Sequence, residues 1–109
     1  MQIKSYSRYD YQVLFITEDL TTGSDLTEIQ ELIEEYPSMK NVAVKFTQNS
    51  CLYTESLFIL SHCYRLLAER GGELAILQPN ETIASALHTI GLDQLIPIYN
   101  SEEALERKE

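Results

Sequence analysis

The chain has 109 residues, of which 17 are acidic and 8 are basic, so its formal net charge at pH 7 is -9. A nucleic-acid backbone would repel so acidic a chain, because phosphates are bound through clustered lysine and arginine side chains. Hydrophobic residues make up 44% and charged residues 23% of the chain, the balance of a folded domain and not of a disordered acidic tail. We therefore expect a single domain over residues 1–109 and no nucleic-acid partner.

Secretion and membrane insertion are not indicated by the sequence. No apolar run approaches the roughly 20 residues that a membrane span needs, and the first residues lack the basic-then-apolar order of a signal peptide. Cys51 and Cys63 stand in neither a C-x-x-C nor a C-x-x-H spacing, so we expect reduced thiols in preference to a disulfide. These features predict a cytoplasmic protein without direct membrane insertion.

The first 40 residues predict a β-hairpin and then an amphipathic helix. The first strand is expected at residues 2–7, where the residues alternate loosely, and the second at 11–17, which is β-branched and aromatic. The turn between them is expected at residues 8–10. Apolar side chains then recur at helical spacing up to Tyr36, and Pro37 ends the helix. Ser24 or Asp25 can cap this helix, with Glu28 placed to close a capping box.

The remaining elements alternate between strands and helices. We expect buried strands at 42–46 and 74–77, helices at 54–70 and from Asn80 to a C-cap at Gly91, a short or edge strand at 96–99, and a final acidic helix from Glu102 to about Lys108 capped by Ser101. Parallel strands need crossover helices, so this order favours a mixed, mostly parallel sheet. The predicted fold class is α/β, with four or five strands flanked by about four helices.

The long helix at 54–70 is apolar on two sides. One side carries Leu57, Leu60, Tyr64 and Leu67, and the other carries Ile59, Cys63 and Leu66. The sheet can cover one side and a second copy of the chain can cover the other, which leaves a homo-oligomer open.

No catalytic, metal or cofactor motif stands out, so we expect neither an enzyme nor a bound cofactor. The chain has no G-x-G-x-x-G, P-loop, G-x-S-x-G or H-E-x-x-H sequence. His62 beside Cys63 is too small a set for a metal site, since adjacent helical residues point about 100° apart. The sequon at Asn80 is interpreted as a helix cap.

Two features remain open to a functional reading. The segment 18–35 carries seven acidic and no basic residues, which suits either the solvated face of a helix or a docking face for a basic partner. Thr54 opens the long helix, where free backbone N–H groups could stabilise a phosphate. Local sequence alone favours the simpler reading that Thr54 is an N-cap.

The C-terminal half resembles the STAS-domain family, specifically the anti-sigma-factor antagonists of bacterial partner-switching systems. The matching stretches are a helix end with a double glycine and a strand, and the chain's ending, at residues 69–79, 89–99 and 101–105. The match continues back through Val42 and is loose before residue 40. The resemblance implies the STAS fold and a regulatory protein that binds other proteins.

In that family the long helix typically starts with Asp-Ser-Ser-Gly, whose first serine is phosphorylated by an anti-sigma kinase. Here Tyr53, Thr54, Glu55 and Ser56 occupy those places, and Phe58 stands where a small residue is usual. The resemblance therefore implies Thr54 as the phosphoacceptor and Tyr53, Glu55, Ser56 and Phe58 as partner-binding residues. The acidic Glu55 would repel an incoming phosphate, so regulated phosphorylation is the part of the family pattern most affected.

The implied partners are an anti-sigma factor or serine-protein kinase and a PP2C-type phosphatase. A different class remains open, in which the chain is a small STAS subunit of a lipid-transport ATPase complex with a structural binding role. Some family members are reported to bind nucleotide, but this sequence offers no phosphate loop. Co-purification of an anti-sigma kinase or of an ATPase with its permease would separate the first two readings.

Overall fold

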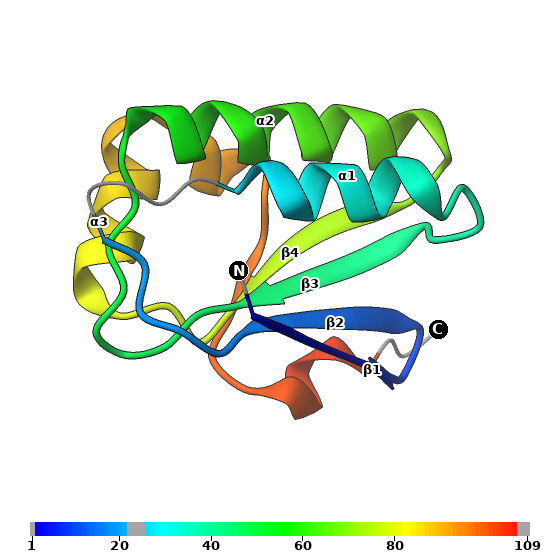
Figure 1. Ribbon diagram of the computed structural model, residues 1–109, viewed down its shortest axis with the longest axis horizontal. Coiled ribbons are helices and arrows are strands. Elements are labelled where there is room, and N and C mark those ends of the chain that lie inside the picture. Colours follow the sequence, from blue (N-terminus) through cyan, green and yellow to red (C-terminus); the bar gives the residue numbers. More distant parts are fainter. Residues whose placement is uncertain (1, 22–25, 107–109) are drawn as a thin grey trace.

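The computed structural model describes residues 2–21 and 26–106 as a five-stranded mixed sheet with helices packed on it (Figure 1). The strands are β1 (Ile3–Arg8), β2 (Tyr11–Ile16), β3 (Asn41–Lys45), β4 (Glu73–Leu77) and β5 (Ile98–Tyr99). The helices are α1 (Thr27–Glu35), α2 (Thr54–Glu69) and α3 (Glu81–Thr89), with short 3-10 turns η1 (Leu92–Gln94) and η2 (Glu102–Leu105). The predicted α/β class and the order of elements are confirmed.

The strands lie side by side in the order in which they occur along the chain. β1 pairs antiparallel with β2, and β2, β3, β4 and β5 then pair in parallel. The hairpin turns at Tyr9, whose φ of 55° is in the left-handed region that tight hairpin turns need. The hairpin expected at residues 2–17 is therefore confirmed, with Arg8 paired as the last residue of β1.

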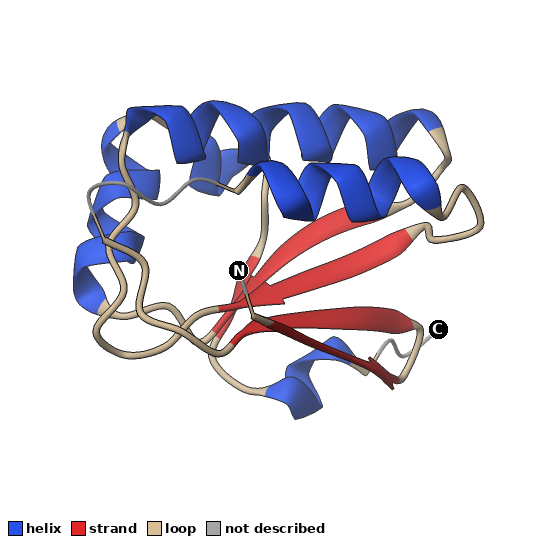
Figure 2. Cartoon of the chain, in the orientation of Figure 1, coloured by secondary structure: helices blue, strands red, loops and turns tan. Residues whose placement is uncertain are grey.

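Helices α1 and α2 lie over one face of the sheet, and α3 lies beyond the carboxyl ends of its parallel strands (Figure 2). Right-handed crossovers between parallel strands that advance in one direction place every connecting helix on the same side. Side chains from α1, α2 and α3 accordingly share one core with alternate residues of the central strands, among them Leu14, Val44 and Ile76. Both apolar stripes of α2 meet this core, because Leu60 and Cys63 are buried in it and Ile59 and Leu66 pack against it.

The opposite face of the sheet is covered in part by η2. Val13, Ala43 and Leu77 point to this side and form a second cluster with Leu105. We call the segment from 100 to 106 the C-terminal strap. It lies across the face of the sheet that α1 and α2 leave open (Figure 1).

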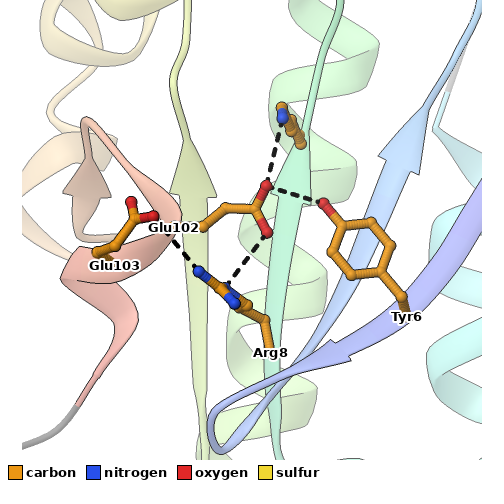
Figure 3. A network of polar contacts seen from close by, with 5 residues as sticks. Tyr6, Arg8, Glu102 and Glu103 are labelled. Atoms are coloured by element: carbon orange, nitrogen blue, oxygen red, sulfur yellow. Dashed lines mark hydrogen bonds and ion pairs between the residues drawn. The ribbon is translucent and has the colours of Figure 1, made fainter.

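Polar contacts hold the C-terminal strap at Glu102 (Figure 3). The Glu102 carboxylate accepts a hydrogen bond from the Tyr6 hydroxyl at 3.1 Å and from Lys45 Nζ at 3.4 Å. It also lies 3.8 Å from Arg8 Nε, and Arg8 reaches Glu103 at 3.4 Å. Burial and the neighbouring Glu102 raise the pKa of Tyr6, because both disfavour a phenolate there. Strand β1 is thereby tied to the C-terminal strap.

Two sequence expectations need correction at element ends. The final acidic helix is only the 3-10 turn η2, and Ser101 makes no side-chain cap bond. Thr54 is not the N-cap of α2, since Tyr53 holds that position. The N-cap of α1 is Leu26, without a side-chain cap bond. The caps proposed at Ser24 and Asp25 lie outside the described residues.

The expected cap at Asn80 is confirmed, since Asn80 accepts a hydrogen bond from the backbone N–H of Ile83 at 2.8 Å at the start of α3. The C-cap expected at Gly91 is instead Ile90. Gly91 follows it with φ 78°, in the left-handed conformation that is common just after a helix. In the described part of the chain, no helix has the length and apolar character to cross a bilayer.

Candidate functional site

The candidate site lies where the chain leaves β3 and enters α2. Tyr53 is still extended, with φ -111° and ψ 174°, and its carbonyl oxygen accepts the backbone N–H of Leu57 at 3.0 Å. Leu52 and Leu57 are buried on either side of this junction, each 8% exposed. These two buried leucines fix the first turn of α2 against the core. The residues between them lie at the N-terminal end of α2.

Four of the five proposed site residues are exposed together on this turn. Phe58 is 69% and Tyr53 41% exposed, and Thr54 and Glu55 are also exposed. Phe58 is four residues after Thr54 and three after Glu55, a spacing that places side chains on one face of a helix. We call Tyr53, Thr54, Glu55 and Phe58 the helix-start surface.

Ser56 does not share this surface. Its side chain is only 2% exposed, and it belongs to the buried side of α2 with Leu60, Cys63 and Leu67. Ser56 can therefore shape the first turn from within, but it offers no surface to a partner in this conformation. Of the five residues predicted to bind a partner, only the four of the helix-start surface are exposed.

The chemistry available at the helix-start surface is that of an exposed hydroxyl next to a large exposed ring. Thr54 is the first residue of α2, where the leading backbone N–H groups have no partner within the helix. These groups and the helix dipole favour an added negative charge. Glu55 occupies the same first turn and opposes that charge. Phe58 supplies apolar area of the kind that anchors protein interfaces.

The acidic residues of α1 are exposed beside α2. Glu28, Glu31, Glu34 and Glu35 all face solvent, and α1 packs directly on α2. The exposed row suits both readings left open by the sequence, a solvated helix face and a docking face for a basic partner.

Other candidate residues do not assemble into a site. His62 is exposed while Cys63 is fully buried, and His88 pairs with Asp93 at 2.8 Å. Burial raises the pKa of the Cys63 thiol to about 12, and the nearby Glu34 adds to the shift, so this sulfur is a poor nucleophile. Both cysteines are free. In the ranges 2–21 and 26–106, no group of three or more His, Cys, Asp or Glu side chains is arranged to hold a metal ion.

One polar network was missed by the sequence analysis, which treated Asn80 only as a cap. In the structure its amide also reaches two carbonyl groups of the loop before α2. These contacts join residues about 30 positions apart, so no local pattern could predict them. The two segments lie close together because they follow the neighbouring strands β3 and β4.

Comparison with known proteins agrees with the fold. The family model of the STAS domain matches residues 9–105. The candidate anti-sigma factor antagonist TM1081 of Thermotoga maritima has a crystal structure that matches with a TM-score of 0.80 and 18% identity, over 94% of this chain and 91% of that one. Its NMR structure gives a TM-score of 0.77 and 16% identity, over 95% and 85%.

A substituted form of RsbS from Moorella thermoacetica matches with a TM-score of 0.66 and 18% identity, over 93% of this chain and 91% of that one. A search of curated proteins finds no significant match. The structural likenesses establish a common fold, and the family model covers nearly the whole chain. The chain therefore belongs to the STAS-domain family.

Proposed function

We propose that this protein is a non-enzymatic regulatory module that binds an anti-sigma factor or a related switch kinase through its helix-start surface. The observation that carries the proposal is the joint exposure of Tyr53, Thr54, Glu55 and Phe58 on the first turn of α2. Membership of the STAS family and the likeness to a candidate anti-sigma factor antagonist support it. An aromatic anchor beside a modifiable hydroxyl suits a contact that can be switched.

Phosphorylation of Thr54 by the partner kinase is the proposed control, with a PP2C-type phosphatase as the reversing activity. A phosphate on Thr54 would place about two negative charges beside Glu55 and Phe58, in the middle of the contact. Because Phe58 would have to lose its water on binding, a charged and hydrated neighbour weakens the complex. Phosphorylation is therefore expected to release the partner.

The binding surface is tested by purifying partners on the intact protein and on two matched variants. Phe58→Ala removes the exposed ring of the helix-start surface. Tyr36→Ala removes a 51%-exposed ring just after the last residue of α1, at the end of the α1–α2 layer away from the helix-start surface. We expect the partner's affinity to fall roughly tenfold to hundredfold with Phe58→Ala, the effect of losing an interface anchor, and to be unchanged with Tyr36→Ala. Equal binding by Phe58→Ala and the wild type would refute this surface.

The identity of the partner separates the two functional classes. Recovery of an anti-sigma kinase favours the proposed switch, whereas recovery of an ATPase together with a permease favours a structural subunit of a lipid-transport complex. Incubation with the purified kinase should add a single phosphate that is absent from Thr54→Ala. A wild-type chain that stays unmodified under these conditions would remove phosphorylation from the proposal and leave binding in place.

A further inference from the structure

A buried hydroxyl lies under the loop that leads into α2. The side chain of Ser50 is fully buried, and its Oγ accepts the backbone N–H of Leu20 at 3.0 Å. Thr47 Oγ1 lies 2.7 Å from Ser50 Oγ and donates to Asp19 at 2.6 Å. The backbone N–H of Cys51 donates to the Leu20 carbonyl at 3.0 Å. The loop after β3 is thus fixed to the segment that follows β2.

The loop is held on its other side by one amide from beyond β4. Asn80 Nδ2 donates to the carbonyl oxygens of Gln48 and Ser50, both at 2.8 Å. Its Oδ1 accepts the backbone N–H of Ile83 at 2.8 Å, which caps α3. Both N–H groups of the amide donate to the loop before α2, and its oxygen accepts from the first turn of α3.

The backbone conformation of the two residues before Asn80 directs the chain toward the loop before α2. Gln78 has φ 47°, which is uncommon for a residue other than glycine, and its N–H donates to the Tyr99 carbonyl at 2.8 Å. Pro79 then fixes the next φ. A non-glycine residue in the left-handed region costs free energy, and such positions persist where the surrounding structure requires them. Here the turn carries Asn80 from the end of β4 to the loop of the neighbouring strand.

We propose that Asn80 is a positioning residue for the helix-start surface, holding the loop that presents Thr54 through its contacts with Gln48 and Ser50. This inference rests on the proposed function, because it concerns the same surface. It adds that the start of α3 and the start of α2 are set by a single side chain. Loss of the two amide hydrogen bonds should make the loop before Thr54 more mobile. A substitution that keeps a side-chain acceptor at residue 80 can still cap α3.

Asn80→Ser separates the two roles of the amide. A serine at the N-cap still accepts the Ile83 N–H, but it has no second group to reach Gln48 and Ser50. Asn49→Ser makes the same change at an exposed residue of the loop itself and serves as the control. Should Asn80→Ser fail to fold, Asn80→Asp keeps a cap acceptor and likewise removes the amide donors.

Amide hydrogen exchange measured by NMR on the full chain reads the effect directly. The probes are the N–H groups of Ser50 and Cys51, which are bonded to Thr47 and Leu20, with the amides of β3 as the internal reference. We expect roughly tenfold faster exchange at both probes in Asn80→Ser, the size expected for lost hydrogen bonds of ordinary strength, with Ile83 still protected. The Thr54 amide resonance should shift in the same variant and not in Asn49→Ser.

Unchanged exchange at Ser50 and Cys51 relative to β3, or an equal change in Asn49→Ser, would overturn the assignment. With a purified partner, Asn80→Ser should bind roughly fivefold more weakly than Asn49→Ser. Faster exchange with equal affinity, for a partner whose binding Phe58→Ala weakens, would also overturn Asn80 as a positioning residue. A partner that Phe58→Ala binds as well as the wild type does would instead refute the proposed function, and the exchange result would still stand because it does not depend on any partner.

Discussion

Folding changes the acid–base chemistry of the buried Cys63 thiol. Its pKa is raised from 9.0 to about 12, mainly because burial disfavours the thiolate, and the folded state therefore keeps a proton that the unfolded state loses above pH 9. The stability linked to this thiol is fully present below pH 9 and is lost as the pH rises toward 12. It contributes a slope of up to about 1.4 kcal/mol per pH unit in that interval.

Denaturant unfolding of the wild type and of Cys63→Ala between pH 8 and pH 11 checks this slope. The variant is expected to be less stable at pH 8, because a small cavity replaces the sulfur. Its stability should then fall less steeply than that of the wild type above pH 9. Parallel curves for the two proteins would show that Cys63 does not carry the linkage. Other groups that titrate in this range affect both curves equally.

The two thiols should also differ in reactivity. Cys63 is fully buried and Cys51 is half-buried in the loop before α2. With iodoacetamide at pH 8, Cys51 is expected to be alkylated at least about tenfold faster, because the reactive species is an accessible thiolate. Mass spectrometry of peptides taken at early times measures the ratio. Equal labelling of both cysteines would mean that α2 opens readily.

The sequence predicted the exposed residues of the helix-start surface. Motif matching, however, grouped Ser56 with them, although its side chain is buried. The helical period does contain the signal, since Ser56 precedes Leu60 by four residues and Cys63 by seven. A hydroxyl at the end of that buried stripe faces inward. The family pattern aligned this position with a partner-facing residue, and the phase of the helix corrects it.

The junction between α2 and β4 depends on two glycines for different reasons. A Cβ added to Gly72 would lie 1.7 Å from the Lys40 carbonyl oxygen, which accepts the N–H of Glu73 where β3 and β4 meet. A Cβ added to Gly71 meets nothing within 4 Å, but the residue has φ 79°. Close approach of the backbone therefore excludes a side chain at Gly72, whereas only the backbone conformation disfavours one at Gly71.

Gly71→Ala and Gly72→Ala consequently form a matched pair. We expect Gly71→Ala to lower the free energy of unfolding by about 1 kcal/mol, the penalty of a left-handed alanine. Gly72→Ala should cost several times more, on the order of 3 kcal/mol or above, because the β3–β4 pairing must shift. Urea unfolding of both variants decides the order. A smaller loss for Gly72→Ala than for Gly71→Ala would contradict the close approach.

At the level of elements, periodicity predicted the core of each helix and strand better than its ends. Pro97 restricts the last strand to Ile98–Tyr99, although the apolar run begins at Ile96. The acidic C-terminal segment has the composition of a helix, but Leu105 is buried against the sheet and η2 ends there. Tertiary contacts that sequence patterns do not carry decide such ends.

At the scale of the whole molecule, polar contacts tie the C-terminal strap to strands β1 and β3. Leu105 is 1% exposed, and Glu102 gathers Tyr6, Arg8 and Lys45. Leu105→Ala is expected to destabilise the protein by roughly 2–5 kcal/mol, as for other buried leucines. Glu102→Gln should cost about 1 kcal/mol or less, because this network is partly exposed to solvent.

Thermal unfolding of the two variants measures these losses, and limited proteolysis locates them. Cleavage after Arg8 should become faster in Leu105→Ala, since β1 loses the segment that covers it. The exposed Glu106 offers a control substitution, Glu106→Gln, in the same segment. If Leu105→Ala is as stable as that control, the strap is not part of the cooperative fold.

The order of the strands has a consequence for how the protein is made. Each strand pairs with the one synthesised just before it, so the sheet can grow at one edge as the chain leaves the ribosome. No strand must wait for a later one to fill a gap between neighbours. The last edge is closed by a strand of two residues, too short to recruit another chain. A nascent sheet of this topology thus grows at one edge only, with β1 as the opposite edge throughout, and growth ends at a strand of two residues.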